Sequence, residues 1–122
     1  MDELNAVEIK AFVPARDFAL SKQFYVDLSF TIVWSDSDLA CLRSGHCSFL
    51  LQNFSHPEHA ANFMMHLLVG DVEAWWRHVQ KAQLVAKYAV QAEPPADRAW
   101  GMRDFTITDP TGVLWRIAQN SA

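Results

Sequence analysis

The sequence predicts an α+β fold made of two βαβββ modules, which form a curved mixed sheet with a concave cup. Two segments each run from an apolar strand, through Asp17 or Asp71, into an amphipathic helix. Each unit is followed by short strands separated by turn residues, and the last two strands form a recognisable hairpin. At 122 residues the chain fits one domain, expected over 1–122 with modules at about 5–54 and 63–120.

The first module begins with a predicted strand at Val7–Val13, which leads into the first helix. Asp17 is suited to the N-cap of this helix, because its carboxylate can accept hydrogen bonds from free backbone N–H groups. The residues expected to face inward from the helix are Phe18, Phe24, Tyr25 and Leu28. Three short strands are expected to follow, at Thr31–Trp34, Leu39–Leu42 and Cys47–Gln52. Residues 54–62 then form the predicted linker between the modules.

The second module repeats this pattern, with a strand at Phe63–Val69 and Asp71 at the N-cap of a helix. The inward residues of this helix follow helical spacing: Val72, Trp75, Trp76 and Val79. Strands are expected at Ala86–Val90, Met102–Thr108 and Leu114–Ala118, with residues 93–98 as a loop.

The hairpin between the last two strands has the clearest turn in the chain. Its turn, Asp109–Gly112, places Pro where φ near −65° is needed and Gly where the chain leaves the turn. Alternation along the last strand places Trp115 against a helix and Arg116 on the open face of the sheet. A charge among apolar neighbours at this position requires a partner or a function.

Composition excludes several classes of function. The net charge of −4 and the absence of a Lys/Arg run argue against nucleic-acid binding. The apolar runs are too short to span a bilayer, and no secretory signal is visible, so we expect no membrane partner and a cytoplasmic location. Cys41 and Cys47 match neither a redox nor a zinc pair, which favours reduced thiols.

Several short motifs resemble those of the vicinal oxygen chelate superfamily, which includes glyoxalase I, extradiol dioxygenases and bleomycin resistance proteins. The motifs are Val13–Phe18, Phe24–Phe30, Phe54–Pro57, Val69–Val72 and Asp109–Asn120. Their order and spacing most resemble the bleomycin resistance branch. The resemblance implies paired βαβββ modules and a homodimer that binds a small-molecule ligand.

The enzymes of this superfamily hold a divalent metal at the bottom of the cup. Aligned by the resemblance, their four ligand positions fall at Lys10, Gln52 (or Leu50 in the alternative register), Met64 and Arg116. An ammonium or guanidinium group has no lone pair to donate, so the sequence argues against a metal in the usual site, and no cofactor is expected.

The alternative is a displaced divalent-metal site. Glu8, Gln52 and His66 are acceptable ligand types for such a site. His56 and His59 also resemble a metal pair, but they lie in a Pro-containing linker without a third ligand in view.

Seven residues are candidates for contact with a ligand. They are Phe12, Trp34, Phe49, Gln52, His66, Trp100 and Arg116. Trp100 is suited either to stacking on a planar ring or cation, or to capping the core at a strand end. Arg116 is suited either to clamping a carboxylate or phosphate, or to pairing with an acidic neighbour such as Glu8.

These observations leave three functions open. The first is a metal-free binding protein of the bleomycin-resistance type, which sequesters an aromatic or cationic ligand in a groove formed by the cup and the dimer interface. The second is a divergent glyoxalase- or dioxygenase-like enzyme with a displaced metal. The third is an interaction module whose cup is filled by its own side chains. No nucleophile–base motif and no Gly-rich phosphate loop is present, so catalytic residues are not expected.

Overall fold

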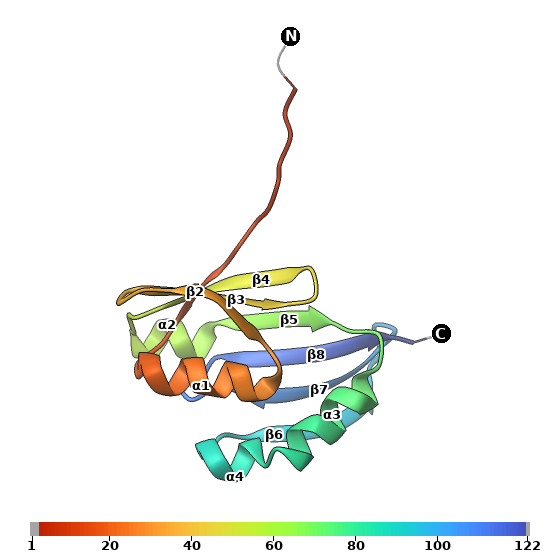
Figure 1. Cartoon of the computed structure of the whole chain (residues 1–122). Helices are drawn as coiled ribbons and strands as arrows, with labels where there is room; N and C mark the ends of the chain where they lie inside the picture. Colours follow the sequence, from red (N-terminus) through yellow and green to blue (C-terminus); the bar gives the residue numbers. More distant parts are fainter. Residues whose placement is uncertain (1–2, 122) are drawn as a thin grey trace.

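A computed structural model of the chain describes residues 3–121 and shows two sheets with helices packed against them (Figure 1). The first module contains β1 (Phe12–Pro14), α1 (Phe18–Leu28), β2 (Thr31–Ser35), β3 (Leu39–Ser44) and β4 (Cys47–Gln52), and is followed by α2 (Pro57–Asn62). The second contains β5 (Met64–Leu68), α3 (Val72–Lys81), α4 (Leu84–Tyr88), β6 (Ala92–Asp97), β7 (Met102–Thr108) and β8 (Leu114–Asn120). The α+β class with two βαβββ modules is confirmed.

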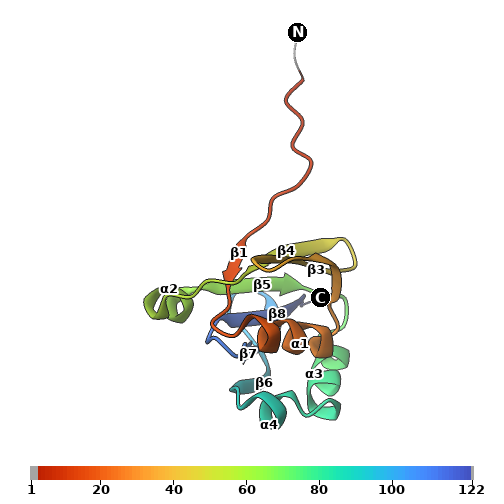
Figure 2. The same cartoon turned by 60° about the vertical axis from the view of Figure 1, so that its left-hand side comes forward.

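The two modules have the same sheet topology. The first sheet has the order β1-β4-β3-β2 and the second the order β5-β8-β7-β6, so each is four-stranded. In both, the strand before the helix pairs in parallel with the last strand of its module, and the other pairs are antiparallel. The predicted curved sheet therefore consists of two matching sheets, one above the other in Figure 2.

The aspartates before the two long helices cap them as predicted. The side chain of Asp17 accepts from the backbone N–H of Leu20 at 3.1 Å, and that of Asp71 accepts from Ala74 at 3.1 Å. Helix α1 ends at Ser29, whose left-handed φ of 105° turns the chain into β2.

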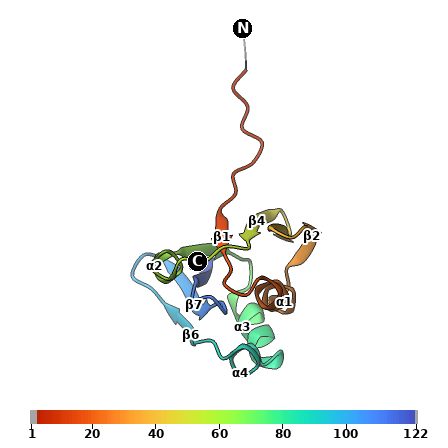
Figure 3. The same cartoon turned by 90° about the vertical axis from the view of Figure 1, so that its left-hand side faces the viewer.

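The core lies between the helices and the inner faces of both sheets. Figure 3 shows α1, α3 and α4 gathered on one side of β6 and β7, with the first sheet above them. Tyr25 of α1 packs edge-to-face on Phe49 of the first sheet and at a tilt on Trp115 of the second, with ring centroids 5.0 and 5.5 Å away. Trp115 thus faces a helix, and Trp76 packs on Phe105 of β7, as expected from their spacing.

The turn of the last hairpin is anchored to the first module. One carboxylate oxygen of Asp109 accepts from the backbone N–H groups of the next residues, Thr111, Gly112 and Val113, at 2.8 to 3.0 Å. The other accepts from the hydroxyl of Tyr25 at 2.5 Å. The side chain of Thr111 also accepts from the backbone N–H of Arg16, so the turn caps the beginning of α1.

Three sequence predictions of local structure were wrong. Residues 86–90 were predicted as a strand, but 86–88 belong to α4 and 89–90 follow its end; the buried residues Leu84 and Tyr88 of α4 lie one turn apart on the same side. The predicted loop at 93–98 is mostly β6, an edge strand whose two prolines coincide with a shift of register. The predicted linker contains α2, which begins with Pro57 at a position that needs no backbone N–H.

The first strand is also shorter than predicted. Only Phe12–Pro14 forms β1, while residues 3–11 form no helix or strand and run away from both sheets (Figures 1 and 2). Leu4, Val7 and Ile9 are almost completely exposed, at 101%, 89% and 95%. We call residues 3–11 the N-terminal arm.

Both cysteines are free thiols, with Cys41 buried and Cys47 exposed. Within residues 3–121, no helix combines the length and the apolar content needed to cross a lipid bilayer.

Candidate functional site

The outer face of the first sheet, opposite α1, carries three of the candidate residues. The strand pairing places Phe12, Leu50, Cys41 and Trp34 in one row across β1, β4, β3 and β2. Phe12 and Trp34 are 49% and 46% exposed, so two large aromatic surfaces lie open on this face. Gln52 is on the same face, two residues along β4 from Leu50.

Phe49 lies on the inner face, which corrects its predicted position in the cup. It is only 2% exposed and packs edge-to-face on Tyr25 and Trp115. Side chains alternate along a strand, so positions 49 and 52 of β4 necessarily face opposite ways. Phe49 still borders a groove of about 290 Å³ between β4 and β5, which His66 also lines.

The outer face of the second sheet carries the remaining candidates. His66 of β5 pairs in register with Arg116 of β8, which pairs with Thr106 of β7. The guanidinium carbon of Arg116 lies 5.8 Å from the ring centroid of Trp100, which is 61% exposed. Met64 is 55% exposed on the same face. The outer-face candidates therefore form two groups, one on each sheet, while Phe49 and His66 border the same groove between the sheets.

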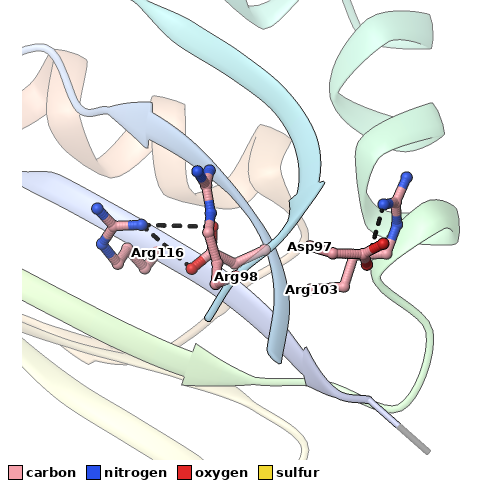
Figure 4. A network of polar contacts seen from close by, with 5 residues as sticks. Asp97, Arg98, Arg103 and Arg116 are labelled. Carbon is pink, nitrogen blue, oxygen red and sulfur yellow. Dashed lines mark hydrogen bonds and ion pairs between the residues drawn. The ribbon is translucent and has the colours of Figure 1, made fainter. Parts of the chain in front are cut away.

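Arg116 pairs with a carboxylate, but with Asp104 rather than the predicted Glu8. Its Nη1 lies 3.1 Å from Oδ2 of Asp104 (Figure 4). The other oxygen of this carboxylate, Oδ1, accepts from Nε of Arg98 at 2.8 Å. Asp104 is 1% exposed, and the two guanidinium groups compensate its buried negative charge. Glu8 instead pairs with Lys10 and accepts from the Ser48 hydroxyl at 2.8 Å, and the Lys10 contact holds the pKa of Glu8 below its usual value.

The donor set does not fit the metal of the superfamily enzymes. Of the four expected positions, Lys10 and Arg116 carry cations that are already paired with carboxylates. For the displaced alternative, Gln52 lies on the first sheet and His66 on the second, while Glu8 is in the N-terminal arm. No group of three His, Cys, Asp or Glu side chains within residues 3–121 is arranged to hold a metal ion.

The two histidines of the linker belong to α2 and its N-terminus. His56 is the N-cap of α2, and His59, within that helix, packs edge-to-face on Phe63 with ring centroids 5.1 Å apart.

Sequence analysis missed a buried polar network beneath the outer faces. The hydroxyl of Tyr25 donates to Asp109 and accepts from Nε1 of Trp115 at 2.9 Å. Burial raises the pKa of Asp109, although bonds from Tyr25 and backbone N–H groups oppose this effect, and burial also raises the pKa of Tyr25. The aromatic periodicity indicated only that Tyr25 faces inward, since no local pattern gives the partner of its hydroxyl.

Comparison with known proteins agrees with this fold. A model of the Glyoxalase/Bleomycin resistance protein/Dioxygenase superfamily matches residues 5–117. A bleomycin resistance protein of Klebsiella pneumoniae is 29% identical over 113 residues, which cover 88% of each chain.

Two solved structures share the fold. The bleomycin resistance determinant encoded on transposon Tn5 is 24% identical with a TM-score of 0.80, over 96% of this chain and 100% of that one. A bleomycin-binding protein complexed with bleomycin is 26% identical with a TM-score of 0.79, over 95% of this chain and 100% of that one.

Proposed function

Because the chain belongs to the Glyoxalase/Bleomycin resistance protein/Dioxygenase superfamily, we propose that it is a metal-free antibiotic-binding protein of the bleomycin-resistance type. It sequesters an aromatic or cationic small molecule in a groove formed by its outer sheet faces and the dimer interface. Sequestration needs only affinity and sufficient protein, and no chemical step.

The observation that carries this proposal is the pairing of the two cations at the expected metal positions. Arg116 is held by buried Asp104, and Lys10 is paired with Glu8. A metal ion at these positions would have to displace both ion pairs and would still find no lone pair on either side chain. Binding therefore accounts for these residues better than metal-dependent isomerase or dioxygenase chemistry.

The open aromatic side chains support the choice of ligand. Phe12 and Trp34 lie on the first sheet and Trp100 in the turn between β6 and β7 of the second, each about half exposed or more. Aromatic rings this exposed give up few contacts within the protein when a ligand binds, and they gain a stacking partner. These rings lie on or beside different sheets, and a second copy would bring them opposite each other.

A homodimer supplies the second face. The N-terminal arm bonds to β4 through Glu8 and Ala11, but it leaves Leu4, Val7 and Ile9 almost completely exposed. Exposed apolar side chains of this kind favour packing on another surface. We therefore propose that the arm packs on a second copy, which brings the first sheet of one protomer opposite the second sheet of its partner.

Calorimetric titration with bleomycin tests the ligand proposal. We expect saturable binding, weakened about tenfold or more in Trp34→Ala and Trp100→Ala, because a lost stacking ring is worth about 1–3 kcal/mol. Val85→Ala, on α4 and 42% exposed, is the matched control and should bind as the wild type does. No binding tighter than millimolar would contradict sequestration of bleomycin. Elemental analysis that finds one tightly held metal per protomer, lost in Gln52→Ala or His66→Ala, would favour the enzyme instead.

Sedimentation analysis tests the dimer separately. The wild-type protein should sediment as a dimer, and Ile9→Asp should shift it to a monomer, because a charge replaces a buried methyl surface at the interface. Leu20→Asp changes an exposed residue of α1 and should leave the dimer intact. A monomeric wild type, or an Ile9→Asp dimer as stable as the wild type, would overturn the role of the arm.

A further inference from the structure

Two arginines on the outer face of the second sheet share a single carboxylate. Arg98 follows β6 and reaches Asp104 through Nε, and Arg116 of β8 reaches it through Nη1, at 2.8 and 3.1 Å. Asp104 is 1% exposed, whereas each arginine side chain is 28% exposed. Two positive charges therefore meet one negative charge, and the cluster keeps one positive charge in excess in a partly desolvated place.

Most of the donors of this cluster are unused. A guanidinium group has five N–H donors in a rigid fork. Within the described part of the chain, Nη1 and Nη2 of Arg98 and Nε and Nη2 of Arg116 have no protein acceptor. Figure 4 shows the terminal nitrogens of Arg98 pointing away from the dashed contacts, whereas one terminal nitrogen of Arg116 makes these contacts and the other points away. Asp104 fixes both forks while leaving their outer edges open.

The surroundings of the cluster fit a planar group. The ring of Trp100 lies beside Arg116 and is 61% exposed. His66 is the register partner of Arg116 on β5. Glu93 of β6 is the register partner of Thr106 on β7, and within residues 3–121 it bonds to neither arginine. An aromatic platform therefore adjoins an open pair of guanidinium forks.

We propose that Arg98 and Arg116 form an acceptor site for the carboxylate of an aromatic ligand whose ring stacks on Trp100. A carboxylate matches the planar fork of a guanidinium group and neutralises the excess charge. The inference rests on the proposed function, since it concerns the same outer face, and it narrows the ligand at this end to an aromatic acid. Asp104 is a positioning residue, because it orients the two forks without touching the ligand.

Titration with 2-naphthoate and with its neutral analogue 2-naphthamide, followed by NMR, tests the inference. The acid should bind about tenfold more tightly than the amide, because charge-assisted bidentate hydrogen bonds are about twice as strong as neutral ones. Arg98→Gln should abolish this preference while leaving Arg116 to pair with buried Asp104. Arg77→Gln removes one positive charge from the exposed face of α3 and should keep the preference. Arg98→Lys, which keeps the charge but loses the fork, should retain only part of it.

Two further measurements distinguish a specific carboxylate site from nonspecific electrostatic attraction of an anion. Trp100→Ala should weaken the acid and the amide equally, because both rings stack on the same indole. Equal affinities of the wild type for the two probes, or an unchanged preference in Arg98→Gln, would overturn the inference. If naphthoate is preferred but bleomycin does not bind, the acceptor site stands and sequestration of bleomycin fails. If bleomycin binds without a preference for naphthoate, the acceptor site alone fails.

Discussion

The hydroxyl of Tyr25 connects the two modules, and its removal by Tyr25→Phe should be strongly destabilising. The group donates to Asp109 at 2.5 Å and accepts from Trp115 at 2.9 Å, and all three residues are at most 2% exposed. Without it, the indole N–H has no acceptor and the carboxylate loses one of its donors. Each unpaired buried group costs about 1–3 kcal/mol, but Asp109 keeps three backbone donors, so we expect a total loss of about 3 kcal/mol. This corresponds to a fall in Tm of about 10 °C for a domain of this size.

Urea unfolding followed by circular dichroism measures this loss. Tyr88→Phe is the matched control, because the hydroxyl of Tyr88 donates to Asp27, which keeps the ammonium of Lys87 as a partner. The control should lose about 1 kcal/mol or less. Trp115→Phe removes the orphaned N–H, so in a double-mutant cycle it should cost less on the Tyr25→Phe background than alone. A Tyr25→Phe loss no larger than that of the control, or strictly additive costs, would refute the reasoning.

Three smaller effects follow from other contacts. The hydrogen bonds from Lys87 and Tyr88 lower the pKa of Asp27, so the stability that this carboxylate contributes is present above about pH 4, its unfolded pKa, and is lost as the pH falls through the folded value. Urea unfolding of Asp27→Asn should therefore show a deficit at pH 7 that narrows in acid, and a deficit independent of pH would contradict this. Asp17→Ala should cost about 1 kcal/mol through the lost cap of α1, while Asp17→Asn should cost much less. Gly112→Ala should cost about 1 kcal/mol in the same assay, because φ is 104° although no atom obstructs a new Cβ, and an unchanged stability would mean that the turn relaxes.

The sequence alone predicted the parts of the fold that depend on local chemistry. The caps at Asp17 and Asp71 and the hairpin strand Met102–Thr108 were predicted correctly, because an N-cap and a Pro–Gly turn act over a few residues. The position of Trp115 followed from the alternation of a strand with one buried face.

The errors arose where tertiary context overrides local preference. The small and β-branched residues around α4 resembled those of a strand. The helix forms nevertheless, because its five residues bury Leu84 and Tyr88 against the core. The two prolines of β6 indicated a loop, because proline is tolerated in strands mainly at a sheet edge or a bulge. The sequence alone does not show that β6 is at the edge of its sheet. Residues 7–11 have a strand-like sequence, but their pairing with β4 is limited to the carbonyl oxygen of Ala11, which accepts from the backbone N–H of Leu50.

The candidate site could have been sharpened from the hairpin register. Once Asp109–Gly112 is the turn, Thr106 must lie opposite Arg116, and alternation then places Asp104 on the same face, diagonal to Arg116. The second arginine could not be predicted in this way, because residues 93–98 were predicted as a loop, whereas Arg98 follows the strand β6 that pairs with β7 at Asp104.

The attachment of the hairpin turn to α1 has an evolutionary consequence. Tyr25 and Arg16 belong to one repeat, and Asp109 and Thr111, which they contact, belong to the other. The two repeats share a topology, but this contact makes them different from each other. Neither repeat can therefore change its side of the contact freely, and related sequences should show paired substitutions between these positions rather than independent drift.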